Sequence, residues 1–389
     1  MKSDLPPKLA AHLEEKWREL QAGLAARAVD LPNDADLIDC LRGGFAFSDF
    51  VANTCIREPA MLVDLIETGD LIRRYVSGNE YRQKVAHAIE GLDAPSRLER
   101  RLRRLRRREM VRIALRDLGG LSDVFETMGD LTAFADSVIQ ISLDYLYEHQ
   151  AALHGSPVGK SGAPVHPVVI GLGKLGGEEL NFSSDVDLIF TYSENGHTAG
   201  GDASLSNEEF FARLFRNLYH LLGKKTEDGC VFRVDLRLRP FGENGPMAMS
   251  FDSMEHYYQT QGREWERYAW IKARVSAGDF EAGTRLLRRL APFVFRRYLD
   301  FGAFESLRDM KNKIEREVKR KGLKDNIKLG WGGIREIEFF GQIFQLSGKI
   351  RQSPIGCAGA PPTVSSGLGN ISAHGFHQVH CCLAFHYPD

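Results

Sequence analysis

The stretch that decides the fold is residues 171–190, GLGKLGGEELNFSSDVDLIF, which follows the apolar run at 168–170. It contains two competing signals. The first is the spacing of Gly171, Gly173 and Gly176, which matches the G-x-G-x-x-G fingerprint of dinucleotide-binding folds. The second is an Asp-x-Asp pair within an alternation of polar and apolar residues that is typical of a strand. The two signals predict different folds.

The dinucleotide-binding interpretation fails on space and on charge. Only seven residues lie between Gly177 and Asp185, which is too few for the helix of a βαβ crossover. Asp185 and Asp187 would also lie in a strand buried on both faces, where unpaired carboxylates are costly. A glycine fingerprint alone is a weak signal, so the aspartate pair is the better guide.

The aspartate pair predicts a metal site. Side chains two residues apart in a strand point to the same face, so Asp185 and Asp187 are expected to project together. The alternate residues Val186, Leu188 and Phe190 would then face the core. Two adjacent carboxylates repel each other unless a cation lies between them or one is protonated. A hard cation such as Mg²⁺, held by carboxylates and substrate phosphates, is the common solution.

A second polar strand is predicted at 231–238. Arg233, Asp235 and Arg237 would face one side together with Arg239, and apolar residues alternate with them. The pattern alone fits a half-exposed strand with solvated charges. Combined with the first aspartate pair, however, Asp235 can complete a site of three carboxylates, and the arginines can neutralise phosphate. Two metal ions about 3.5–4 Å apart could then assist an in-line phosphoryl or nucleotidyl displacement.

The composition is that of an ordinary globular protein. Its length of 389 residues predicts two or three domains. The 51 lysines and arginines balance 52 acidic residues, which excludes a protein that coats nucleic acid through a high positive charge. The six cysteines do not suggest a disulfide scaffold, and the N-terminus lacks the apolar core of a secretory signal. No stretch approaches the roughly 20 apolar residues that span a bilayer. We therefore expect a cytoplasmic protein with neither membrane nor nucleic acid as a partner.

The periodicity of apolar residues predicts an α+β chain in four parts. Residues 1–155 are expected to be a helical domain, and 156–285 an α/β core of strand, turn, strand, helix and strand. Within this core, Ser206 and Glu209 predict a capping box, and Gly223 predicts the end of the same helix. Residues 286–346 are expected to be a truncated helical region.

The last part, 347–389, differs from the rest of the chain. No acidic residue occurs between Glu338 and Asp389, and no period is visible. One interpretation is a disordered tail translated out of frame. The other is a zinc site, because imidazole and thiolate are natural zinc ligands, although the spacing matches no two-pair zinc pattern. Its ligands would be His374, His377, Cys381 and Cys382.

Residues 97–108 hold eight arginines and one glutamate. Such a run could form a surface for an acidic partner or for nucleic acid. The spacing of Leu98, Leu102 and Leu105 gives the same helix a core face, so a solvated arginine helix is the simpler interpretation.

Several runs of this sequence resemble one family, the bifunctional glutamine synthetase adenylyltransferase/adenylyl-removing enzyme. The resemblance covers residues 35–346 and is carried by GLGKLGGEELNFSSDVDLIFTYSENG from Gly171 and by four further runs. These are RRREMVRIALRDLGG from Arg106, VFRVDLRLRPFGENGPMAMSF from Val231, QGREWERYAWIKARVSAGD from Gln261 and NIKLGWGGIREIEFFGQIFQL from Asn326. The Gly-Gly and Asp-x-Asp motifs alone would indicate only the wider polymerase-β-like superfamily.

The resemblance implies a polymerase-β-like nucleotidyltransferase core flanked by helical regions. The family enzyme has two related halves. Its N-terminal half removes AMP from a tyrosine of adenylylated glutamine synthetase by phosphorolysis, releasing ADP, and its C-terminal half attaches AMP from ATP. This chain resembles the N-terminal half, so adenylyl removal is the implied activity, with the PII signalling protein and glutamine as implied regulators. Trp331 departs from the family pattern, and the resemblance ends at Ser347.

The predicted site combines both lines of argument. Asp185, Asp187 and Asp235 are the predicted catalytic residues and would hold Mg²⁺, two ions if the two-metal scheme applies, with Mn²⁺ as an alternative. The residues predicted to bind nucleotide or phosphate are Lys174, Gly176, Gly177, Ser184, Arg233, Arg237 and Arg239. The alternatives are a non-catalytic fragment that binds nucleotide or glutamine synthetase, and an enzyme that attaches AMP.

Overall fold

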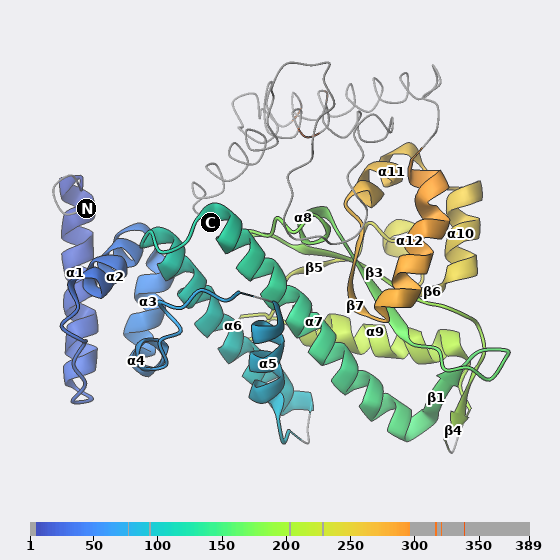
Figure 1. Cartoon of the computed structure of the whole chain (residues 1–389), viewed down its shortest axis with the longest axis horizontal. Helices are drawn as coiled ribbons and strands as arrows, with labels where there is room; N and C mark the ends of the chain where they lie inside the picture. The colour runs from blue at the N-terminus through green and yellow to red at the C-terminus, as the bar shows by residue number, and fades with distance from the viewer. Residues whose placement is uncertain are drawn as a thin grey trace. The chain divides into compact units, whose positions relative to one another are not determined.

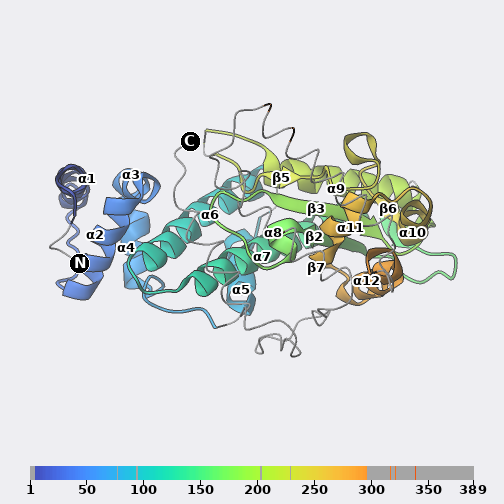
Figure 2. The same cartoon turned by 90° about the horizontal axis from the view of Figure 1, so that it is seen from above.

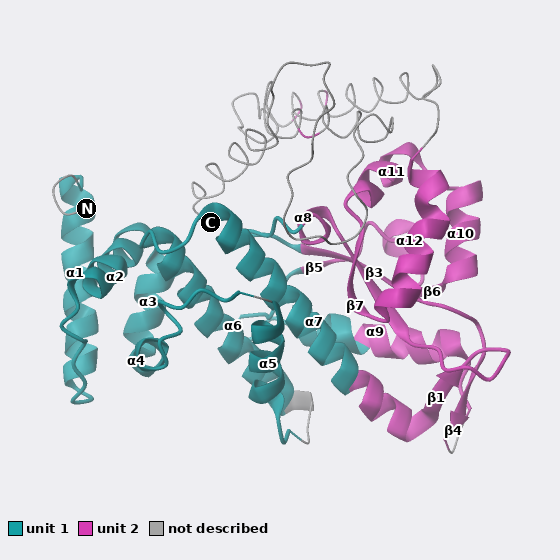
Figure 3. Cartoon of the chain, viewed as in Figure 1, with its two compact units in different colours: residues 1–145, 178–185, 217–233 teal, residues 146–177, 186–216, 234–389 magenta. Residues whose placement is uncertain are grey.

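The computed structural model describes residues 5–76, 78–92, 95–201, 204–227 and 229–295, together with residues 316, 320 and 338. The chain divides into two compact units (Figure 3). Unit 1 comprises residues 1–145, 178–185 and 217–233, and unit 2 comprises residues 146–177, 186–216 and 234–389. The predicted tail with its candidate zinc ligands lies outside the described residues, as does nearly all of the predicted helical region beyond residue 295. The four-part division of the chain stays a prediction.

The regular elements in the described residues of unit 1 are helices. Its helices are α1 (Pro7–Ala25), α2 (Ala35–Phe47), α3 (Asp49–Arg57), α4 (Pro59–Glu67), α5 (Gly78–Ile89), α6 (Pro95–Leu118), the first part of α7 (Val124–His154) and the last part of α9 (Asn207–Gly223) (Figure 1). The side chains of Asp34 and Ser48 cap α2 and α3, because each accepts a hydrogen bond from a backbone N–H of the first turn. Leu20, Leu41 and Phe45 are fully buried in the core that the helices enclose.

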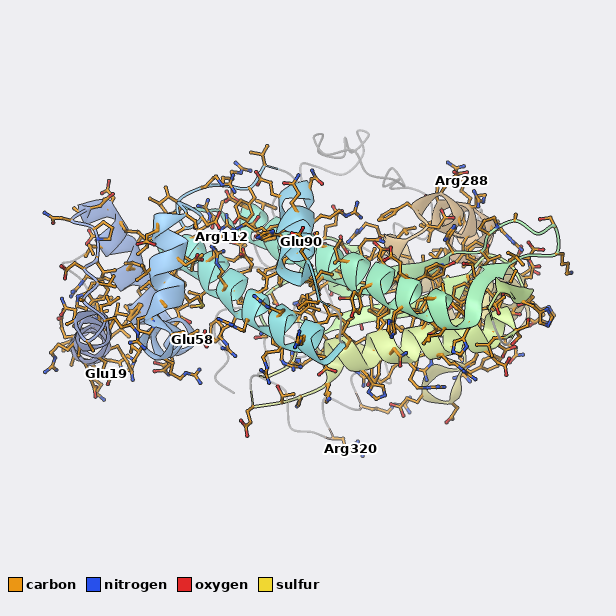
Figure 4. All side chains as sticks on the ribbon, turned by 90° about the horizontal axis from the view of Figure 1, so that it is seen from below. Glu19, Glu58, Glu90, Arg112, Arg288 and Arg320 are labelled. Carbon is orange, nitrogen blue, oxygen red and sulfur yellow. The ribbon has the colours of Figure 1, made fainter. Side chains whose placement is uncertain are left out.

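The inner face of α6 carries a buried polar cluster around Arg112, which Figure 4 labels. The Arg112 side chain is inaccessible to solvent and donates a hydrogen bond to Asp130 Oδ2 at 3.0 Å. It also donates to the backbone carbonyls of Asp70 and Arg73, at 2.8 and 2.6 Å. A guanidinium in the core is stable only with such a complete set of acceptors.

Unit 2 contains the strands and is built around one mixed sheet in the order β5-β3-β2-β7, with β6 also pairing with β3. The strands are β2 (Pro167–Leu172), β3 (Val186–Tyr192), β5 (Val234–Asp235), β6 (Met249–Ser250) and β7 (Arg274–Gly278). Strand β2 runs antiparallel to both β3 and β7, whereas β3 runs parallel to β5 and β6. A β2–β3 antiparallel pair excludes the parallel βαβ unit of a dinucleotide-binding fold, which confirms the choice made from the sequence. A second, two-stranded sheet joins β1 (Gly155–Val158) to β4 (His197–Gly200).

Helices cover both faces of the mixed sheet (Figures 1 and 2). On one face, Val168, Ile170 and Ile189 pack with residues of α10 (Phe251–Thr260), α11 (Glu264–Ile271) and α12 (Phe280–Val294). On the other face, Phe190 stacks on Phe215 of α9 (Asn207–Gly223), with 4.5 Å between ring centroids. Because successive side chains of a strand point to opposite faces, the apolar residues of β2 and β3 are buried on both faces of the sheet. The chain is therefore α+β, as the sequence predicts.

Candidate functional site

Two of the three predicted carboxylates lie side by side in unit 2. The parallel pairing of β3 with β5 places Asp187 next to Asp235, and Val186 next to Val234. Residues in register on neighbouring strands project from the same face of a sheet. The Asp235 side chain is 14% exposed, so the pair lies at the surface end of the sheet without being freely solvated.

Arg237 keeps Asp235 ionised. Its Nε donates to both carboxylate oxygens of Asp235, at 3.0 and 2.9 Å, its Nη2 donates to Oδ2, and its backbone N–H donates to Oδ1 at 2.8 Å. These hydrogen bonds lower the pKa of Asp235, and partial burial opposes them only in part. Asp235 is therefore an anion at neutral pH, as a ligand of a divalent cation must be.

The glycine turn after β2 packs against this pair. Its single helical turn, α8 (Gly173–Gly176), leads the chain away from the end of β2. Gly173 has a φ of +53°, and a Cβ there would come closer than 3.0 Å to Asp187 Oδ2. A Cβ on Gly176 would come as close to the backbone oxygen of Lys272. Glycine is thus required at both positions, at Gly176 because the protein's own backbone approaches it.

Two residues that the sequence did not single out support this turn. Arg274 on β7 donates from Nη2 to the backbone oxygen of Leu175 at 3.0 Å. Lys272 supplies the carbonyl beside Gly176, and its Nζ is 2.8 Å from Glu338 Oε1. No local pattern could have revealed these contacts, because Arg274 and Leu175 are 99 residues apart in the chain.

The remaining predicted residues take the following places. In unit 1, Arg233 Nε donates to Asp185 Oδ1 at 2.6 Å, and both side chains are about half exposed. The hydroxyl of Ser184, also in unit 1, donates to Asn181 Oδ1 at 2.6 Å. In unit 2, Arg239 donates to the backbone carbonyls of Leu236, Glu243 and Gly245 and so holds the loop after β5. Lys174 lies in α8, and Gly177 ends that helix with its N–H directed to the carbonyl of Gly173.

The predicted strand at 231–238 is wrong in length. Only Val234 and Asp235 pair as a strand, although the apolar residues on either side of them, Phe232 and Leu236, are buried as the alternation predicts. The strand ends because the Asp235 side chain accepts the backbone N–H of Arg237, two residues on. Such a local turn competes with the ladder of a sheet.

The carboxylates offer a divalent cation a pair of oxygen donors. Among the described residues, no three side chains of His, Cys, Asp or Glu come together in a group that could hold an ion. Asp187 and Asp235 nevertheless form an adjacent pair of oxygen donors, of which Asp235 is held ionised, and this chemistry suits a hard divalent cation. Within the same part of the chain, no helix combines the length and the apolar character needed to cross a membrane.

The fold and the site define an α+β protein with a carboxylate pair beside a tight glycine turn. A family model described as glutamate-ammonia ligase adenylyltransferase matches residues 38–289. The chain belongs to this family, as the sequence resemblance predicts. A second model, described as GlnD PII-uridylyltransferase, matches residues 308–361, nearly all of which lie outside the described residues.

Three curated relatives carry the name bifunctional glutamine synthetase adenylyltransferase/adenylyl-removing enzyme. The relative from Nitrosococcus oceani is 48% identical over 352 residues, which cover 90% of this chain and 36% of the relative. That from Thioalkalivibrio sulfidiphilus is 51% identical over 320 residues, 82% of this chain and 33% of the relative. The relative from Pseudomonas aeruginosa is 50% identical over 328 residues, which cover 84% of this chain and 33% of the relative. The chain thus spans about a third of the length of these relatives.

Proposed function

We propose that this chain removes AMP from adenylyl-tyrosine of glutamine synthetase by phosphorolysis, with phosphate consumed and ADP released. The observation that carries the proposal is the placement of Asp187 beside Asp235 on adjacent strands, next to the glycine turn. The relatives' names contain both adenylyl attachment and adenylyl removal. The resemblance of this chain to the N-terminal half of the family favours removal.

The proposed architecture is a polymerase-β-like nucleotidyltransferase core. Its support is a mixed sheet in which β2 and β3 are antiparallel, with the glycine turn following β2 and one candidate carboxylate on each of two neighbouring strands. The substrate phosphates would approach the end of the sheet where these carboxylates and the glycine turn lie.

In the proposed reaction, an oxygen of inorganic phosphate attacks the phosphorus of the AMP group. A new P–O bond forms, the bond from that phosphorus to the tyrosine oxygen breaks, and the tyrosine oxygen takes up a proton. No side-chain nucleophile is needed. Asp187 and Asp235, together with Asp185, would hold Mg²⁺ or Mn²⁺, which when bound offsets the negative charge that develops on the phosphoryl oxygens.

The basic residues would bind the two phosphates of the nascent ADP. Arg237 is placed for this role because its guanidinium is 69% exposed and already bonded to a site carboxylate. Its planar fork matches phosphate oxygens as well as it matches Asp235. Arg233, Arg239, Lys174 and Ser184 complete the proposed set, and Gly176 and Gly177 keep the turn compact.

The proposal is tested by incubating adenylylated glutamine synthetase with this chain, Mg²⁺ and phosphate, and measuring ADP. We expect Asp187→Asn and Asp235→Asn each to lower the rate at least about a hundredfold, because the bound cation contributes several kcal/mol of charge stabilisation. Asp30→Asn is the matched control, since Asp30 is exposed and distant in sequence from every site residue. ADP release that is unchanged in both site variants would refute the assignment.

The same assay separates the alternatives. Binding of nucleotide or glutamine synthetase without turnover would indicate a non-catalytic fragment, and ATP-dependent labelling of glutamine synthetase would indicate adenylyl attachment. A cytoplasmic location and regulation by PII and glutamine are part of the proposal, through the resemblance to the family. Adding PII or glutamine to the ADP assay tests that regulation directly.

A further inference from the structure

Apart from Arg106, the arginines of the basic run at 97–108 in α6 fall into two sets. The first set has acidic partners within unit 1. Arg103 lies 3.5 Å from Glu99, Arg107 is bonded to Glu58, and Arg108 bonds to Asp64, Asp70 and Glu109. These contacts belong to the packing of α6 against its neighbours, which accounts for part of the basic run at 97–108.

The second set lines a pocket. Arg97, Arg100, Arg101 and Arg104, together with Leu92, surround an open cavity of about 390 Å³. All four arginine side chains are exposed, whereas Leu98 and Leu102 on the same stretch of helix are completely buried. The buried leucines therefore hold one face of α6 in the core, and the four arginines point outward. The sequence predicted a solvated arginine helix but not a pocket.

Helix geometry brings the four guanidinium groups to one face. At about 100° per residue, positions 97, 100, 101 and 104 fall within an arc of about 100° around the helix axis. At a rise of about 1.5 Å per residue, positions 97 and 104 are about 10 Å apart along the axis. Four positive charges are thus gathered within the length of a small organic molecule.

Most of this positive charge has no acceptor in the described protein. Arg100, Arg101 and Arg104 make neither a hydrogen bond nor an ion pair with any residue that the structure describes. Glu99, the single carboxylate in the run, is bonded to Arg103 and lies 3.5 Å from Lys224. Like charges held this close repel one another, and a bound anion would relieve the repulsion.

We propose that this arginine pocket binds a small organic polyanion that carries at least two phosphate groups. Guanidinium groups bind phosphate oxygens in bidentate fashion, and the pocket volume lies in the range of small-molecule sites. The partly buried Leu92 supplies an apolar wall for the organic part of the ligand. The short span of the arginines favours a compact ligand over a nucleic-acid duplex or an extended acidic protein face. The site is formed by residues of unit 1 alone.

The test removes divalent ions from the full chain with a chelating resin and measures the binding of inorganic tripolyphosphate by titration calorimetry. The proposed phosphorolysis site depends on those divalent ions, so the two proposals fail independently. We expect saturable binding by the native chain. Arg100→Gln/Arg101→Gln/Arg104→Gln should weaken it at least about tenfold, because charge-assisted hydrogen bonds are about twice as strong as neutral ones.

The matched control removes three exposed arginines elsewhere in unit 1. Within the described part of the chain, Arg18, Arg27 and Arg57 each donate only to the backbone carbonyl four residues earlier. Arg18→Gln/Arg27→Gln/Arg57→Gln therefore changes the net charge equally and should leave the affinity within about twofold. Absence of binding by the native chain, or equal weakening in both triple variants, would overturn the proposal. Absence of binding would favour an acidic protein surface as the partner of these arginines.

Discussion

Replacing Arg112 by methionine tests the buried cluster of unit 1. Arg112 donates four hydrogen bonds, and its guanidinium lies 3.6 Å from the centre of the Tyr75 ring. Methionine fills much of the same volume but leaves Asp130, whose side chain is 8% exposed, without its cationic partner. Breaking one member of a buried ion pair costs about 3–5 kcal/mol, so we expect Arg112→Met to lower the free energy of unfolding by about that amount. For a domain of 150–250 residues this corresponds to about 6–20 °C in Tm.

The loss of unfolding free energy in Arg112→Met should depend on pH. Burial raises the pKa of Asp130 and Arg112 counteracts it. Without Arg112, the folded-state pKa of Asp130 rises further above its unfolded value. A carboxyl of this kind stabilises the fold below its unfolded pKa and loses that contribution as the pH rises through the folded pKa. The destabilisation by Arg112→Met should therefore be larger at pH 8 than at pH 5.

A double-mutant cycle followed by urea unfolding measures the coupling free energy between Arg112 and Asp130. The variants are Arg112→Met, Asp130→Asn and their combination, with Arg18→Met as an exposed control. Because the combined variant no longer buries a lone charge, its loss should fall short of the sum of the single losses by about 0.5–3 kcal/mol. Strictly additive losses, or a loss below about 1 kcal/mol for Arg112→Met, would show that the cluster does not hold unit 1 together.

Two further substitutions test the glycine turn and the acid sensitivity of unit 1. Gly176→Ala forces its Cβ against the backbone oxygen of Lys272, so we expect a loss of about 1–3 kcal/mol in thermal melts and a lower rate of ADP release. Burial raises the pKa of Asp70, but hydrogen bonds from Lys84 and Arg108 lower the pKa by more. The stabilisation is therefore complete above the unfolded pKa and is lost as the pH falls towards the folded pKa. Asp70→Asn should be less stable than the native chain at pH 7, with a flatter dependence of urea midpoint on pH below about 5.

Each of these variants has a matched control. Gly129 in α7 has open space where a Cβ would lie, so Gly129→Ala should leave stability unchanged or raise it by about 0.5–1 kcal/mol. A Gly176→Ala protein as stable and active as Gly129→Ala would contradict the close approach of Lys272. For Asp70, the control is the exposed Asp30→Asn. An identical pH dependence in the two variants would place the acid-sensitive charge elsewhere.

Sequence reasoning succeeded where the deciding interactions are local. Ser206 and Glu209 cap α9 reciprocally, since each backbone N–H donates to the other's side chain, and α9 ends at Gly223 as predicted. The strand predicted at the Asp-x-Asp pair is present as β3, but its burial does not alternate beyond Asp187, because Ile189 and Thr191 are buried as well as Leu188. Asp185, however, precedes β3, which begins at Val186.

Sequence reasoning succeeded less well where segments that are distant in the chain come into contact. The contact of Arg274 with the glycine turn depends on the pairing of β2 with β7, and no short motif encodes that pairing. The arginine pocket of α6 was missed for a related reason. The run of arginines is visible in the sequence, but which of them find acidic partners depends on where Glu58, Asp64 and Asp70 are brought by the fold.

The ion pair between Arg237 and Asp235 bears on how the proposed site would accept a cation and a phosphate. Because the Arg237 side chain is largely exposed, the pair resembles a surface salt bridge, which contributes only about 0–1 kcal/mol. Its main effect is on protonation, since the hydrogen bonds lower the pKa of Asp235 and keep it anionic. A divalent cation would therefore meet a carboxylate that is already ionised and would compete with a weakly held partner. Arg237 lies two residues from Asp235 in the chain, so once displaced its guanidinium would bind the phosphate that the cation attracts.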